Sequence, residues 1–142
     1  MCNNGGHWPD HYVGGSIQRV DPATGAVDVL YDSCDGHALC GPNDLVFEAD
    51  GGFWFTDTGK FRGRTRDEGA LYHARPDGSS IVEVIHPAEA PNGVGLSPDG
   101  RTLYYAETIT GRLYRRAIAA PGRLAPIAHL TTSAELAAAW KA

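Results

Sequence analysis

A block of sequence recurs at a spacing of 49 residues, and this repeat restricts the fold more than any other feature of the chain. Residues 42–44 (Pro-Asn-Asp) return as residues 91–93 (Pro-Asn-Gly). The turn at 49–51 (Ala-Asp-Gly) returns at the same offset as 98–100 (Pro-Asp-Gly). A period of about 40 to 50 residues containing several strands is typical of a β-propeller blade. A sandwich with coincidentally similar turns is the alternative.

Short apolar segments separated by Gly, Pro and Asp turns support this interpretation, because they indicate strands joined in hairpins. The expected hairpins pair residues 16–21 with 26–31, 45–47 with 53–57, 71–75 with 81–85, and 93–96 with 103–107, while 112–117 begins a fifth. Helical features occur only in the tail, where 132–135 resembles a capping box before 136–140. We therefore predict an all-β protein with a short C-terminal helix.

The length of 142 residues holds just under three such repeats, whereas a propeller closes with about four to eight blades. We expect an incomplete propeller over residues 1–130, with blade material at 1–40, 41–90 and 91–130, and a helical tail at 131–142. Three blades leave open edges that invite association. The chain is thus expected to be a fragment, or an open arc completed by missing blades from the parent chain or an oligomer.

Charge and hydropathy restrict the classes of partner, and cysteine content indicates the redox state of the thiols. The formal net charge of −5 argues against nucleic acid, and no apolar segment is long enough to span a membrane. Three cysteines, Cys2, Cys34 and Cys40, without a recognisable signal sequence predict free thiols in a cytoplasmic protein. The sequence contains no GxSxG motif, so covalent catalysis by a serine nucleophile has no support.

The repeated asparagines are the candidate metal ligands. Asn43 and Asn92 open equivalent inner strands, so their side chains are expected to converge on the propeller axis. An amide oxygen is a hard, neutral ligand suited to Ca²⁺, Mg²⁺ or Mn²⁺. Turn formation by Pro-Asn is the alternative explanation. Two amides cannot hold a divalent ion alone, so carboxylates must complete the shell.

Three carboxylates are expected to lie beside this site. Asp57 and Glu107 return to the same rim one strand farther out, at least about 4.8 Å away. Asp44 follows Asn43 and either orients the ligand or contacts the neighbouring backbone. The cationic segment 58–66 forms a substrate lid or an ordinary solvated loop.

The segments 41–57 and 91–100 closely resemble the gluconolactonase/regucalcin-like family, the senescence-marker-protein group of six-bladed propellers. Residues 2–6 also resemble a segment that normally lies inside the chain of that family. The resemblance implies hydrolysis of sugar lactones or related carboxylic esters with a divalent metal, usually calcium, with zinc or other ions tolerated. Two Asn, one Glu and one Asp bind the metal in that family, and Asn43 and Asn92 match the two Asn motifs.

The family Glu and Asp have no counterpart in this sequence. Since that Asp is also the family's general base, the catalytic residue of this chain stays unknown. The first hypothesis is a metal-dependent lactone hydrolase acting on a small sugar lactone. The alternative is a non-enzymatic module that binds calcium or a partner, and a phosphotriesterase-like hydrolase is a third possibility.

Overall fold

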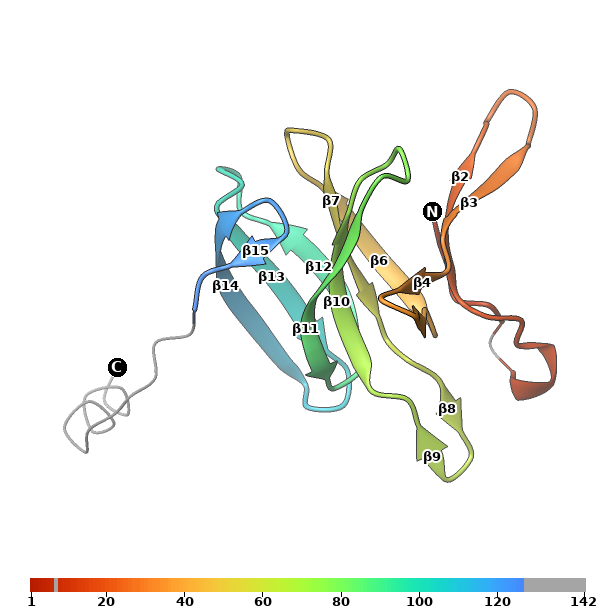
Figure 1. Ribbon diagram of the computed structural model, residues 1–142. Coiled ribbons are helices and arrows are strands. Elements are labelled where there is room, and N and C mark those ends of the chain that lie inside the picture. The colour runs from red at the N-terminus through yellow and green to blue at the C-terminus, as the bar shows by residue number, and fades with distance from the viewer. Residues whose placement is uncertain (7, 127–142) are drawn as a thin grey trace.

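The computed structural model describes residues 1–6 and 8–126, and these residues form an all-β structure (Figure 1). A single turn of 3-10 helix, η1 (Pro9–His11), is the only helical element in this part of the chain. The prediction of an all-β fold is confirmed, while the helix predicted at 131–142 falls outside the described residues. No helix within the described ranges is long and apolar enough to cross a membrane.

The strands form three antiparallel sheets and two small hairpins. The first sheet contains β1 (Cys2–Asn3), β2 (Ser16–Val20) and β3 (Val27–Tyr31) in that order. The second runs from β6 (Pro42–Phe47) through β7 (Phe53–Asp57) and β10 (Gly69–Ala74) to β11 (Ile81–Ala88). The third runs through β12 (Pro91–Leu96), β13 (Thr102–Glu107), β14 (Arg112–Ala120) and β15 (Arg123–Leu124). The small hairpins pair β4 (Ser33–Cys34) with β5 (His37–Ala38), and β8 (Phe61–Arg62) with β9 (Thr65–Arg66).

The inner strands of the three sheets lie side by side, since β1 packs against β6 and β6 packs against β12. This is the arrangement of an incomplete propeller. The repeat also appears in the strand register: Pro42 pairs with Asp57, Pro91 pairs with Glu107, and a register shift follows both prolines. The four predicted hairpins are all present, with boundaries within a few residues of those expected.

Two apolar clusters fill the spaces between the sheets. Phe53 and Phe55 of β7 pack toward the first sheet, where they join a cluster containing Ile17 and Tyr31. Trp54, between them, belongs to the cluster shared with the third sheet. Because successive residues of a strand point to opposite faces, β7 is buried on both sides. Each of these large side chains contributes about 1.5–3 kcal/mol by burial. This burial holds β7 in place up to its last residue, Asp57.

Aromatic side chains pack between the second and third sheets. Trp54 is fully buried and Tyr105 nearly so, and both lie in the cluster between the second and third sheets. Tyr104 is half-buried and belongs to neither cluster. Tyr104 lies between Leu103 and Tyr105, which both belong to that cluster, so it points to the opposite face of β13.

Candidate functional site

Asn43 and Asn92 occupy the same position in successive inner strands. Each is the second residue of its strand, after a buried proline, and each side chain is exposed. The fixed φ of proline and its missing N–H suit the first residue of a strand, where a ladder hydrogen bond is not required. The two asparagines therefore start β6 and β12 in equivalent ways.

A hydroxyl group links the starts of the two strands. Thr56 Oγ1 accepts a hydrogen bond from the Asp44 N–H at 3.2 Å and donates one to the Asn92 carbonyl at 2.5 Å. Asp44 Oδ2 in turn accepts the N–H of Val94 at 3.0 Å. These contacts place Asn43, which precedes Asp44, at the same rim as Asn92. They also show that the Asp44 carboxylate contacts the backbone of the neighbouring blade, one of the two roles expected for it.

The two asparagine amides retain free acceptor oxygens. Among the described residues, the Asn43 side chain has no hydrogen-bond partner, and Asn92 uses only its Nδ2, which donates weakly to Thr108 Oγ1 at 3.4 Å. Exposed amide oxygens of this kind can bind a hard cation. Within residues 1–6 and 8–126, however, no three His, Cys, Asp or Glu side chains gather as potential metal ligands. The described chain thus supplies two neutral oxygens for a metal shell and no carboxylate cluster to complete it.

Asp57 lies at this rim but is turned toward the backbone. Its carboxylate accepts three N–H groups, from Cys40 at 2.7 Å, Gly41 at 2.6 Å and Gly59 at 2.8 Å. The side chain is 3% exposed, and this burial raises the pKa of the Asp57 carboxyl, with the three amide donors opposing the rise. A Cβ atom on Gly41 would lie 2.7 Å from the carbonyl oxygen of Gly59, so the close approach of these two segments requires glycine.

Glu107 has the corresponding position in the third sheet and a similar role. Its carboxylate accepts the N–H of Glu89 at 3.0 Å and the hydroxyls of Thr110 at 2.9 Å and Tyr114 at 3.0 Å. It is 6% exposed. Asp57 and Glu107 therefore fasten the chain entering each inner strand, and their oxygens are occupied by these donors.

A cavity of about 470 Å³ opens beside Asn43. It lies between the N-terminal segment and the chain following β7, and its walls include Asn4, Trp8, Thr58, Lys60 and Phe61. A volume of this size suits a small organic ligand. Asn92 does not line it. Asn4 and Trp8 were not predicted from the sequence as site residues; Asn4 directly follows β1, which packs against β6.

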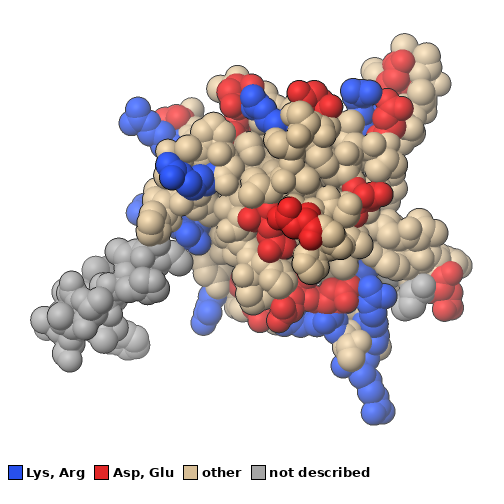
Figure 2. Space-filling model, viewed as in Figure 1, with Lys and Arg blue, Asp and Glu red and all other residues tan. Residues whose placement is uncertain are grey.

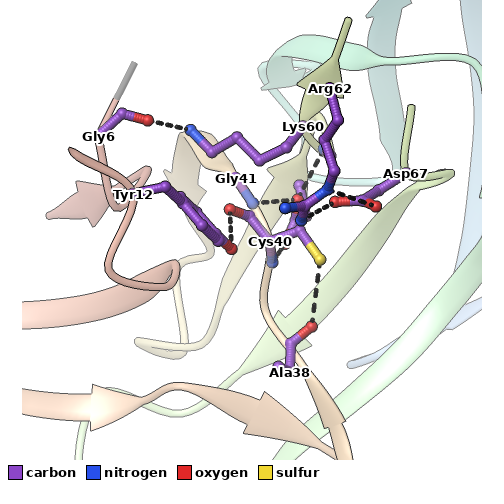
Figure 3. A network of polar contacts seen from close by, with 10 residues as sticks. Gly6, Tyr12, Ala38, Cys40, Gly41, Lys60, Arg62 and Asp67 are labelled. Atoms are coloured by element: carbon purple, nitrogen blue, oxygen red, sulfur yellow. Dashed lines mark hydrogen bonds and ion pairs between the residues drawn. The ribbon is translucent and has the colours of Figure 1, made fainter. Parts of the chain in front are cut away.

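The segment 58–66, which contains the small β8–β9 hairpin, is held to neighbouring segments through Lys60 and Arg62 (Figure 3). Lys60 Nζ donates to the Gly6 carbonyl at 2.7 Å and lies 5.2 Å from the centre of the Tyr12 ring. Arg62 also lies over that ring, at 5.3 Å, and binds Asp67 through both carboxylate oxygens. This segment is therefore a fastened wall of the cavity.

The three cysteines are free thiols, as predicted. Cys40 precedes Gly41 of the cavity wall, and its carbonyl accepts a hydrogen bond from the Tyr12 hydroxyl at 2.9 Å. Burial raises the pKa of the Cys40 thiol to about 11, and that of Cys2 also to about 11. Thiols with raised pKa values are poor nucleophiles, so the rim gains no reactive cysteine from these two residues.

Sequence comparison identifies a related family. Residues 12–134 match the profile of the SMP-30/Gluconolactonase/LRE-like region. A protein named lactonase drp35 from Staphylococcus saprophyticus is 46% identical over 103 residues, which is 71% of this chain and 30% of the relative. Lactonase drp35 from Staphylococcus aureus strain USA300 is 32% identical over 107 residues, or 75% of this chain and 31% of the relative. The chain thus spans about a third of the length of these curated relatives.

Solved structures with the same fold include two gluconolactonases. One from Xanthomonas campestris superposes with a TM-score of 0.66 at 31% identity, covering 80% of this chain and 41% of that protein. A periplasmic gluconolactonase from Pseudomonas aeruginosa superposes with a TM-score of 0.57 at 25% identity, covering 82% of this chain and 34% of that protein. Both likenesses extend over most of the described chain.

Proposed function

The chain belongs to the SMP-30/gluconolactonase/LRE-like family, and on that premise we propose that it contributes to a metal-dependent hydrolase of sugar lactones. The observation that carries this proposal is the pair of exposed asparagine side chains at one rim. Each follows a proline at the start of an inner strand, and the hydroxyl of Thr56 links the backbones of the two strands there. The names of the relatives, lactonase and gluconolactonase, supply the reaction class.

The fit of a divalent ion to this rim is partial. The amide oxygens of Asn43 and Asn92 are exposed and free to act as two ligands, and their neutrality suits calcium, with zinc, magnesium or manganese as alternatives. Carboxylates from the missing blades of the parent chain or an oligomer would complete the shell. A bound divalent ion would polarise the lactone carbonyl and stabilise the negative charge that develops on its oxygen.

The described residues supply binding and positioning more clearly than they supply proton transfer. The cavity beside Asn43 can hold a small lactone, and its walls are fixed by the contacts of Lys60 and Arg62. The nearby carboxylates of Asp44, Asp57 and Glu107 are committed to backbone and hydroxyl donors. We therefore assign no general base to the described residues, and we propose that the base comes from the missing blades.

The absence of a carboxylate from the lining of this cavity favours one second candidate. A module that binds calcium or a partner without turnover needs the amide oxygens but no general base.

The free thiols fit a reducing compartment, so we keep a cytoplasmic location as a proposal. One structural neighbour is itself a periplasmic protein.

Hydrolysis of glucono-1,5-lactone by the full-length parent protein, measured as acid release with and without a chelator, tests the proposed function. Activity that disappears with the chelator and returns with calcium supports a metal-dependent lactonase. Activity that the chelator leaves unchanged would remove the metal from the mechanism. Calcium binding without any hydrolysis would instead favour the non-enzymatic module.

A further inference from the structure

The cavity beside Asn43 is positively charged although the chain as a whole carries a net charge of −5. Its lining includes Lys60 and two asparagines, Asn4 and Asn43, but no Asp or Glu among the described residues that form it. Lys and Arg side chains also gather over the adjoining β8–β9 hairpin, which projects from the body of the molecule (Figure 2). A cavity lined in this way favours an anionic ligand.

Lys60 differs in its partners from two neighbouring cations of this segment, Arg62 and Arg66. Arg62 forms an ion pair with Asp67, and the guanidinium of Arg66 pairs with Glu89. No carboxylate in the described part of the chain lies within ion-pair distance of Lys60, whose ammonium donates to the Gly6 carbonyl at 2.7 Å. An ammonium has three donors. One of them binds the Gly6 carbonyl, and no other hydrogen-bond acceptor in the described part of the chain contacts this ammonium.

Two carboxylates lie near Lys60 but are already engaged by other groups. Asp57 accepts three backbone N–H groups, and Asp67 binds Arg62. Burial lowers the pKa of the Lys60 amine, because desolvation disfavours its charged form, and these two carboxylates oppose that effect only in part. An anion entering the cavity would provide the compensation that the protein itself leaves incomplete.

The Lys60 side chain is also held in place before any ligand arrives. Its contact with the Gly6 carbonyl and its position over the Tyr12 ring tie it to the N-terminal segment. A side chain that is already ordered loses less conformational entropy when it binds a ligand. The exposed rings of Trp8 and Phe61 line the same cavity and offer apolar surfaces to a sugar ring.

From these observations we infer that the cavity selects a lactone carrying a second, anionic group, a carboxylate or a phosphate, which Lys60 binds at the end remote from the ester. The inference rests on the proposed function for the lactone itself. It adds the substrate class: acidic or phosphorylated sugar lactones are preferred over neutral ones. Asn43, in the same cavity, then lies beside the ester end of the substrate.

The test uses stable ring sugars as probes, so that its result does not depend on hydrolysis. Binding of D-glucose, D-glucuronate and D-glucose 6-phosphate to the whole chain is measured by NMR titration at low salt. We expect the glucuronate or the phosphate to bind about tenfold more tightly than glucose, the effect of one charge-assisted contact. The tighter of the two anionic sugars identifies the preferred group.

Three variants provide the controls. Lys60→Gln should abolish the preference for anionic sugars, Lys60→Arg should retain most of it, and Arg64→Gln, on the same hairpin but not lining the cavity, should leave it unchanged. Amide spectra of each variant establish that it is folded. Equal binding of the three sugars, absence of binding by all of them, or a preference that survives Lys60→Gln in a folded protein would overturn the inference. Failure of the full-length parent protein to hydrolyse the lactone would refute the proposed function and leave this binding result standing.

Discussion

Two kinds of polar side chain lie at one rim of this protein, and they differ in exposure and in hydrogen bonding. Asn43 and Asn92 start their inner strands with exposed amides that have few or no protein partners. Asp57 and Glu107 pair with the prolines immediately before those asparagines, yet each is buried and accepts three hydrogen bonds. All four positions belong to the same internal repeat.

The difference separates residues that hold the rim from residues that face outward from it. A buried carboxylate surrounded by donors stabilises the local fold, and removing it leaves those donors without acceptors. An exposed amide with a free oxygen contributes little to folding and is available to a ligand. Substitutions at the two kinds of position should therefore have separable effects on stability and on binding.

The largest expected effect is that of Asp57→Ala. The substitution leaves the N–H groups of Cys40, Gly41 and Gly59 without their acceptor in a buried site. We expect the free energy of unfolding to fall by roughly 3 kcal/mol. Urea unfolding measures the change, and a loss below about 1 kcal/mol would contradict the role given to Asp57.

Glu107→Ala should destabilise the protein less, by about 2 kcal/mol. Only one of its three donors is a backbone N–H, and the hydroxyls of Thr110 and Tyr114 can rotate toward other acceptors. The same unfolding experiment provides the comparison. A larger loss for Glu107→Ala than for Asp57→Ala would reverse the ranking of the two sites.

The pH dependence of stability reports on Asp57 directly. Because its folded-state pKa is raised above the ordinary value of 3.8, the folded protein holds this proton more tightly than the unfolded chain does. The stabilising contribution is therefore complete below pH 3.8 and is lost as the pH rises through the folded-state pKa. Relative to Asp57→Asn, the wild-type protein should lose stability over this rise; a relative gain would show that the amide donors outweigh burial.

The smallest expected effects on folding are those of Asn43→Leu and Asn92→Leu. Both side chains are exposed, and only Asn92 makes a hydrogen bond, a long one of 3.4 Å to Thr108. Each substitution should change the free energy of unfolding by less than about 0.5 kcal/mol. Losses as large as that of Asp57→Ala would mean that the asparagines also hold the rim.

Much of the fold could be predicted from the sequence because short-range patterns determine it. The turns at 49–51 and 98–100 fix the register of the hairpins they close, and the Pro-Asn repeat identifies equivalent strands. The free state of the three thiols was also predicted from the sequence.

The site was less predictable because it depends on contacts between distant segments. Hairpin geometry placed Asp57 at the rim but could not show that Cys40 and Gly41 would turn their N–H groups toward it. The cavity beside Asn43 likewise needs Trp8 and Lys60, which are more than 50 residues apart in the sequence. The positive charge of the segment 58–66 indicated only that it could contact a substrate. Its contacts with Gly6, Tyr12 and Asp67 are evident only in the folded structure.

Calcium binding by the intact parent protein and by its Asn43→Leu variant, measured by calorimetry alongside Asn43→Asp, tests the central claim most directly. We expect Asn43→Leu to weaken calcium binding by at least about tenfold, a loss typical even of residues that only support metal ligands. Asn43→Asp, which keeps the oxygen and adds charge, should retain the ion. Calcium affinity that is the same in wild type and Asn43→Leu would show that this amide is not a ligand.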